Sequence, residues 1–183
     1  VINGVEINDI AIPKGITNIK KGTFYSCTLY SISIPNTVKE IEEEAFYNCA
    51  SLTSINIPDS VLKIGSYAFS ECSSLVSIRI PKCIRTIEEG LFDGCNSLES
   101  VIIPNSVSKI GESAFFDCSM LKSIVIPNSI SKIGEFAFSN CSSLSEVNIP
   151  NGVETIDDWA FLECHSLTKV VIPHSIKSMG KNV

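Results

Sequence analysis

The sequence predicts an α/β solenoid, in which short parallel strands and intervening turns form successive coils. Three observations predict it. Prolines recur along the 183 residues, the first two 22 residues apart and the later ones 23 apart, and the apolar residues align when the chain is registered on them. A unit of this length cannot bury its own apolar face, so neighbouring units must stack to form a core. The prolines are Pro13, Pro35, Pro58, Pro81, Pro104, Pro127, Pro150 and Pro173.

The stretch before each proline predicts a strand. It reads Leu-x-x-Ile-x-Ile-Pro, as in Leu52 to Pro58, and apolar and polar residues alternate at its end. This alternation, among β-branched residues, is typical of a strand with one buried face. Proline ends the strand because it has no N–H to donate. We expect the strands to form the concave face of a curved stack, because their side packs more tightly than the side that carries phenylalanine.

Two further pieces complete each unit. A Val-x-x-Ile segment after the proline predicts a second extended piece, followed in three units by glycine. The next segment spaces apolar residues three apart, as in Ala114, Phe115, Cys118 and Leu121. This spacing favours a single helical or 3₁₀ turn on the convex side, because the segment is too short for an independent helix.

The units fill the whole chain and predict a single domain over residues 1–183. It consists of a partial unit over 1–12, seven repeats over 13–172 and a partial unit over 173–183. Neither end carries the polar terminal unit that solenoids usually need for solubility. We therefore expect either a segment of a longer protein or a chain that associates end to end.

The pattern L-x-x-I-x-I-P followed by A-F-x-x-C resembles the BspA-type leucine-rich repeat, the branch with 23-residue units. The resemblance covers essentially the whole chain and implies a right-handed leucine-rich-repeat solenoid. Known members are mostly surface or secreted proteins of bacteria and of parasitic or commensal protists. The resemblance therefore implies adhesion to host proteins, host cells or other microbes.

The charge balance argues against one class of partner, and the length of the apolar runs argues against another. The chain has 14 Lys and Arg against 20 Asp and Glu, a net charge of −6. We expect no nucleic-acid partner, because such proteins usually carry a basic stripe. No apolar run approaches the ~20 residues of a transmembrane helix, so we expect no membrane insertion.

Seven of the eight cysteines occupy one position in successive units, between the phenylalanine and leucine of the predicted core. They are Cys27, Cys49, Cys72, Cys95, Cys118, Cys141 and Cys164. A ladder of buried thiols, disulfides between neighbouring coils and a metal site are three open interpretations. We favour the buried thiols, because seven is an odd number and no C-x-x-C pair is present. Cys83 stands outside this position, and we expect it to be free and partly exposed.

No pattern in the sequence points to catalysis. The two histidines are His165 and His174, and phosphate-binding loops, G-x-S-x-G and H-E-x-x-H are all missing. Cys164 and His165 could form a nucleophile and its base, but adjacent residues near a turn usually point apart. We expect no enzymatic activity, no catalytic residue, no cofactor and no metal.

Carboxylates form a stripe eight residues after the prolines, and it consists of Glu43, Glu89, Glu112, Glu135 and Asp158. Calcium sites need several oxygens that converge in one loop, whereas these residues belong to separate coils. A solvated acidic flank is therefore the favoured interpretation, with calcium binding as the alternative.

The outward positions of the strands form the candidate binding surface. Two residues before successive prolines, Ile102 and Val125 are neighbouring apolar residues with Arg79 beside them, and Asn56 and Asn148 occupy the same position further out. Exposed apolar residues with an arginine are common anchors of binding patches. Four residues before the prolines, a column of serines leaves room for a partner. β-Branched residues are also common in strands that bind nothing, so this assignment is a hypothesis.

Together these observations predict a non-enzymatic, adhesin-like protein-binding module. We expect it to recognise a host, matrix or other cell-surface protein through its strand face, in an extracellular or cell-surface location. Two alternatives remain open. One is a cytoplasmic leucine-rich-repeat scaffold, which unpaired cysteines would favour. The other is a structural spacer in a larger surface protein.

Overall fold

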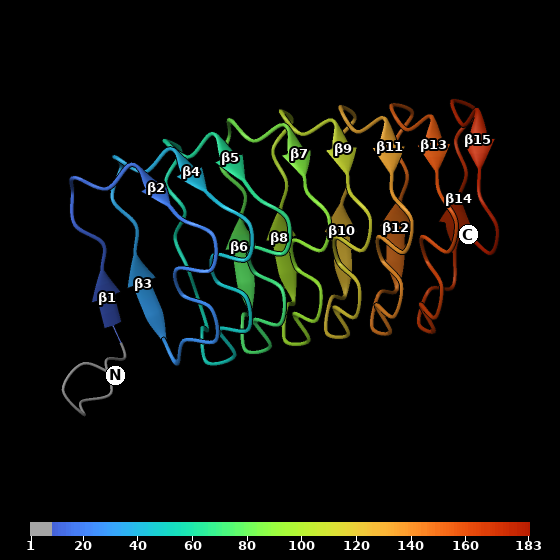
Figure 1. The fold of residues 1–183 in the computed structure, drawn as a ribbon. Coiled ribbons are helices and arrows are strands. Elements are labelled where there is room, and N and C mark those ends of the chain that lie inside the picture. The colour runs from blue at the N-terminus through green and yellow to red at the C-terminus, as the bar shows by residue number, and fades with distance from the viewer. Residues whose placement is uncertain (1–8) are drawn as a thin grey trace.

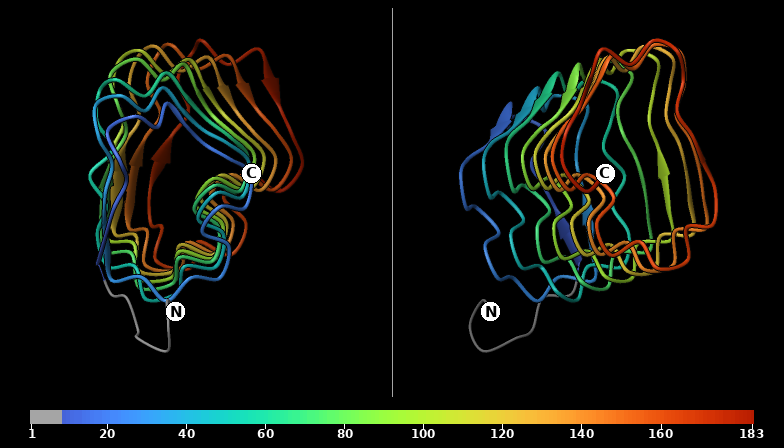
Figure 2. Two further views of the ribbon diagram at one scale, coloured as in Figure 1. Left: turned by 60° about the vertical axis from the view of Figure 1, so that its left-hand side comes forward. Right: turned by 90° about the vertical axis from the view of Figure 1, so that its right-hand side faces the viewer.

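The coils of the chain form one continuous stack. The structure is a computed structural model that describes residues 9–183, so most of the predicted partial unit 1–12 lies outside the described residues. Figure 1 shows two rows of short strands running along the stack, with β1 and β15 at its opposite ends. Successive coils follow nearly the same path (Figure 2). The predicted parallel-strand solenoid with repeats of 23 residues is confirmed.

The first row of strands lies directly before the prolines, as the sequence predicts. It contains β1 (Asp9–Ala11), β3 (Ser31–Ser33), β6 (Ser77–Arg79), β8 (Ser100–Ile102), β10 (Ser123–Val125), β12 (Glu146–Asn148) and β14 (Val170–Val171). Neighbours within each sheet pair in parallel one repeat apart, as Arg79 does with Ile102, and the row is interrupted between β8 and β10, which belong to separate sheets. Between β3 and β6, parallel bridges from Ser33 to Asn56 and from Ser54 to Ser77 continue the row. We call the outward side of this row the strand face.

The second row is formed by the extended piece after each proline. It contains β2 (Asn18–Ile19), β4 (Glu40–Ile41), β5 (Lys63–Ile64), β7 (Thr86–Ile87), β9 (Lys109–Ile110), β11 (Lys132–Ile133), β13 (Thr155–Ile156) and β15 (Ser178–Met179). These strands also pair in parallel, in the orders β2-β4-β5 and β7-β9-β11-β13-β15. The extended piece that the sequence predicts is thus a second hydrogen-bonded row.

The expected helical or 3₁₀ turn is replaced by four-residue turns, and residues 9–183 contain no regular helix. Within one coil, the Cys49 N–H donates to the Phe46 carbonyl at 3.1 Å. The Phe46 N–H instead donates to Ala68 of the next coil at 2.8 Å. A helix would direct its N–H groups along its own axis, so bonding between coils requires a different backbone. Two residues in the turn segment of each coil, such as Ser113 and Asp117, accordingly have left-handed φ angles, here 50° and 54°.

The core lies inside the coils and repeats with them. Isoleucine, valine, leucine, alanine, cysteine and phenylalanine of the consensus are buried in the central coils. The seven phenylalanine rings stack along the axis with centroids 5.1 to 6.0 Å apart. These rings belong to Phe24, Phe46, Phe69, Phe92, Phe115, Phe138 and Phe161. Each core residue therefore packs mainly against its own kind in the next coil.

The phenylalanine ladder and the second row of strands share one irregular step. The rings of Phe69 and Phe92 are the widest pair of the ladder, at 6.0 Å. The second row of strands is interrupted between the same two coils, because β5 and β7 belong to separate sheets. The following coil has buried Leu91 where other coils have alanine, as at Ala68. We attribute the irregularity to the extra volume of this leucine in a close-packed interior.

The stacked ladder predicts the cost of removing one ring. Phe115→Ala should lower the free energy of unfolding by about 3–5 kcal/mol, because a fully buried ring with neighbours on both sides leaves a cavity. Phe115→Leu, which keeps most of the volume, should cost less. Urea-induced unfolding followed by circular dichroism measures both changes. An alanine variant that unfolds with the midpoint of the parent would contradict this packing.

Candidate functional site

The strand face presents alternate residues of the first row. Ile78, Val101 and Ile124, the middle residues of β6, β8 and β10, are buried, whereas their neighbours along the strand point outward. This pattern follows from the pleat of a strand, which directs successive side chains to opposite sides. The outward orientation expected for the candidate residues is therefore present.

The five candidate residues lie in one row across the strand face. Arg79 pairs with Ile102, and Val125 pairs with Asn148 in the parallel register. Ile102 and Val125 occupy the same position one repeat apart, although β8 and β10 belong to separate sheets. Asn56 continues the row beyond Arg79, because Ser54 bridges to Ser77. Ile102 is 63% exposed and Val125 is 80% exposed, although both are aliphatic. We call these five residues the strand-face row. That they bind a partner stays a prediction.

Arg79 is held by an acidic residue that the sequence analysis did not associate with it. Its guanidinium lies 2.9 Å from the Asp59 carboxylate, which also accepts the backbone N–H of Lys82 at 3.1 Å. These two donors lower the pKa of Asp59. Both side chains are partly exposed, so the pair adds little stability. Its effect is to orient the guanidinium beside Ile102.

Two shallow hollows flank the exposed aliphatic pair. The first has a volume of about 380 Å³ and lies where the serine column meets Asn56, Arg79 and Ile102. The second has a volume of about 340 Å³ and is lined by residues that include Glu146, Asn148, Lys169 and Val171. The small serine side chains leave this space open. The strand face therefore combines an exposed aliphatic pair with a hollow of mixed polar and apolar lining on either side.

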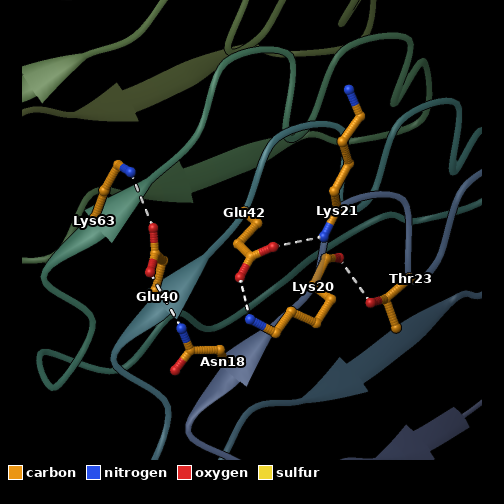
Figure 3. Close-up of polar contacts among 7 residues, drawn as sticks. All are labelled: Asn18, Lys20, Lys21, Thr23, Glu40, Glu42 and Lys63. Carbon is orange, nitrogen blue, oxygen red and sulfur yellow. Dashed lines mark hydrogen bonds and ion pairs between the residues drawn. The ribbon is translucent and has the colours of Figure 1, made fainter.

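The second row of strands carries a ladder of ion pairs, drawn in Figure 3. Lys63 lies 3.0 Å from Glu40, and Lys20 lies 2.7 Å from Glu42 of the next coil. Asn18 also donates to Glu40 at 3.1 Å. The hydrogen bond from Lys20 and the coulombic attraction between the two groups lower the pKa of Glu42. These partners lie about one repeat apart and were not predicted.

The ion pairs also include a member of the acidic stripe. Lys21 lies 2.8 Å from Glu43, so the first member of the stripe is paired with a lysine of the preceding coil. Among residues 9–183, no group of three or more histidine, cysteine or acidic side chains could hold a metal ion. The geometry therefore favours a solvated, partly paired flank over the calcium alternative.

Three carboxylates gather on the turns of the middle coils. Asp93 is half-buried near Glu71 and Asp117, which belong to the neighbouring coils. Burial, together with repulsion from these two carboxylates, raises the pKa of Asp93 to about 6. The ionised form of Asp93 is therefore disfavoured in the folded protein.

The cysteine ladder has a structural role that the sequence analysis did not identify. Each thiol from Cys49 onward donates to the carbonyl of a phenylalanine in the preceding coil, at 3.0–3.2 Å. Burial raises the pKa of the Cys164 thiol to about 11, and raises those of Cys95, Cys118 and Cys141 well above their ordinary range. All eight cysteines are free, and Cys83 is exposed as expected. This arrangement favours the ladder of buried thiols.

The neighbouring Cys164 and His165 do not form a nucleophile and base. The Cys164 thiol donates to Phe138 at 3.1 Å, towards the interior. The His165 ring is exposed and lies 2.9 Å from the Glu163 carboxylate. The two side chains therefore point apart, as expected for adjacent residues near a turn.

An aromatic cluster on the turns was not predicted. Phe136 stacks on Trp159 with ring centroids 5.0 Å apart, and Phe116 meets Phe136 edge-on at 6.4 Å. All three rings are partly exposed. Phe136 and Trp159 have left-handed φ angles of 52° and 54°, which is unusual for bulky residues. We call these three residues the aromatic flank. A signal was available in the sequence, since Phe136 and Trp159 follow their prolines by the same nine residues.

With the repeat geometry established, comparisons with known proteins identify the family. The profile described as "BspA type Leucine rich repeat region (6 copies)" matches residues 2–122 and 109–183. The chain belongs to the BspA-type leucine-rich repeat family. A search of curated proteins found no match. Across residues 9–183, no helix has the length and apolar character needed to cross a membrane.

Solved bacterial structures share this BspA-type fold. The leucine-rich repeat protein of T. pallidum is 34% identical over 82% of this chain and 73% of its own, with a TM-score of 0.78. A leucine-rich cell surface protein of Faecalibacterium prausnitzii is 30% identical over 97% of this chain, with a TM-score of 0.60. A leucine-rich repeat protein of Eubacterium ventriosum is 28% identical over 88%, with a TM-score of 0.81. The matches span 60% and 44% of the last two proteins.

The buried thiols predict selective labelling. In the native protein, a maleimide should modify the exposed Cys83 first and the half-buried Cys27 more slowly, because the other thiols are buried away from the reagent. The remaining six should react only after addition of denaturant. Mass spectrometry of labelled peptides measures each site, and Cys83→Ser serves as the control. Rapid native labelling of Cys95 or Cys118 would contradict the hydrogen-bonded ladder.

Asp93 predicts a pH dependence of stability. Its folded pKa is raised, so the folded state binds the proton more tightly and loses stability as the pH rises from about 4 to about 7. Asp93→Asn should therefore stabilise the protein at pH 7 by about 1–2 kcal/mol, after discounting for solvent screening, and flatten this dependence. Urea unfolding at several pH values measures it. If the free energy of unfolding of the variant changed with pH as steeply as that of the parent, Asp93 would be ruled out as the source of the pH dependence.

Proposed function

We propose that this chain is a non-enzymatic, adhesin-like protein-binding module that recognises a protein partner through its strand face. The observation that carries the proposal is the exposure of Ile102 and Val125, which occupy equivalent positions of the successive strands β8 and β10. Exposing two aliphatic side chains to water contributes nothing to folding, whereas covering them with a partner is favourable by the hydrophobic effect.

The surroundings of the aliphatic pair support protein recognition. Arg79 is oriented by Asp59, so less side-chain entropy is lost when it contacts a partner. Asn56 and Asn148 offer donors and acceptors at the two ends of the strand-face row. An apolar centre with a polar rim is the usual composition of a protein interface. The rigid stack holds these groups at fixed positions, which also reduces the entropy cost of binding.

The partner that we propose is a host, matrix or other cell-surface protein, and the site of action lies outside the cell. The Faecalibacterium prausnitzii relative, described as a cell surface protein, supports this location. The unpaired cysteines no longer favour the cytoplasmic scaffold, because burial and the bonds to carbonyl groups protect the thiols in any compartment. A nucleic-acid partner and membrane insertion stay outside the proposal.

Replacing the aliphatic pair tests the proposal. Ile102→Glu/Val125→Glu should weaken binding to immobilised matrix and cell-surface proteins by about tenfold or more, because buried anchors often contribute 2 kcal/mol or more. Surface plasmon resonance measures the affinity, and circular dichroism verifies the fold. Binding that survives in the double variant would contradict a site on the strand face. Failure of the unsubstituted protein to bind any target would favour the scaffold or spacer alternatives.

Two control variants test whether the loss of binding is specific to the strand face. Leu62→Glu introduces one glutamate at another exposed aliphatic position, next to β5, and should leave binding unchanged. Phe136→Ser/Trp159→Ser removes two rings of the aromatic flank, and loss of binding in this variant alone would move the site to the turns. Sedimentation of each variant reports end-to-end self-association, which stays a prediction.

A further inference from the structure

Asn151 and Gly152 form an exposed turn that repeats elsewhere in the chain with one chemical difference. The Val153 N–H donates to the Pro150 carbonyl at 3.0 Å, so Asn151 and Gly152 occupy the centre of a four-residue turn. Equivalent turns follow the other prolines. Three of them also have an exposed asparagine directly after the proline, and these are Asn36, Asn105 and Asn128. The four asparagines occupy the same position of equivalent turns and differ in the residue that follows.

After the other three asparagines, a hydroxyl group ties the turn to the preceding coil. The hydroxyl groups donate to backbone carbonyls at 2.6–2.8 Å. The donors and acceptors are Thr37 to Ile16, Ser106 to Ile84 and Ser129 to Val107. Glycine has no side chain to make this bond. Within residues 9–183, the N–H of Gly152 has no hydrogen-bond acceptor, and the same is true of the N–H groups of Thr37, Ser106 and Ser129.

The missing Cβ matters for packing as well as for reactivity. A Cβ at Gly152 would overlap the carbonyl oxygen of Asn128 in the preceding coil. Glycine is therefore required at this close approach. The same absence of a side chain leaves the Gly152 nitrogen sterically open to the asparagine beside it. The requirement for glycine thus creates the exposed Asn-Gly pair.

We propose that Asn151 is a site of spontaneous deamidation, which proceeds faster than at the asparagines of the equivalent turns. The backbone nitrogen of Gly152 attacks the side-chain carbonyl carbon of Asn151 and loses its proton. A nitrogen–carbon bond forms, the bond from that carbon to Nδ2 breaks, and ammonia leaves. Water then opens the resulting cyclic imide at either carbonyl, which yields aspartate or isoaspartate.

The modification changes both charge and backbone at one rim of the strand face. It adds one negative charge to a chain of net charge −6, three residues after Asn148. The isoaspartate form also adds a backbone carbon to a turn that packs against Asn128. The neighbouring N–H groups of Glu154 and Thr155 donate to the Ser131 carbonyl at 2.8 and 3.1 Å. Their bonds should weaken when the turn lengthens.

Peptide mapping of the folded protein tests the proposal. After incubation in mildly alkaline buffer, mass spectrometry should show conversion at Asn151 several-fold faster than at Asn36, Asn105 or Asn128. The exchange of hydrogen at Glu154 and Thr155 should accelerate in the converted fraction. Asn3 also precedes a glycine but lies outside the described residues, and its peptide is scored separately.

Two variants make the test decisive. Ser129→Gly removes the hydroxyl bond to Val107 and creates an Asn-Gly pair in the equivalent turn of the preceding coil. Asn128 should then convert at a rate close to that of Asn151. Asn151→Ser should abolish conversion at this position. The proposal would be overturned if Asn151 converted no faster than Asn128 in the unsubstituted protein. Acceleration that occurs only after denaturation would overturn it as well.

Discussion

The structure depends on the bonding of each coil to the next at an interval of one repeat. Backbone N–H groups of both strand rows and of the turns donate between coils, and phenylalanine rings stack along the same direction. Bonds within a coil satisfy only part of its backbone groups, and a single coil cannot bury its own core residues. The left-handed residues of the turns follow from this constraint, because they turn alternate N–H groups toward the neighbouring coil. The same requirement explains why successive units differ mainly at exposed positions.

The rigid stack also favours binding, because it holds the outward side chains in place before a partner arrives. Outward residues of the first row are spaced by the strand separation of about 4.8 Å, so their positions relative to one another are fixed before any partner arrives. This arrangement brings the exposed side chains of Ile102 and Val125 together on neighbouring coils, although the two residues lie 23 positions apart in the sequence. The aromatic flank shows that the turns can gather exposed apolar side chains by the same mechanism.

The periodicity predicted the repeat, both extended pieces, the burial of the core positions and the outward orientation of the strand-face row. It could not predict the turn conformation, because the three-residue spacing of Phe115 and Cys118 suits a helical turn as well as the observed turns. Contacts between coils, such as Arg79 with Asp59 or the Cys118 thiol with Phe92, depend on side-chain direction and were also missed. The wider spacing of Phe69 and Phe92 beside Leu91 was also missed, because it depends on how the side chains pack in three dimensions.

The central claim, that bonding at one-repeat intervals determines the fold, is tested most directly by deleting one complete unit. Removing residues 128–150 joins Pro127 to Asn151 and keeps Arg79, Ile102 and Val125 on adjacent coils. The account predicts that the shortened protein keeps its circular dichroism spectrum and unfolds cooperatively in urea. A single residue inserted between Ile124 and Val125 should instead disrupt folding, because a one-residue shift turns buried side chains outward. A unit deletion that fails to fold, or an insertion that unfolds like the parent, would contradict the account.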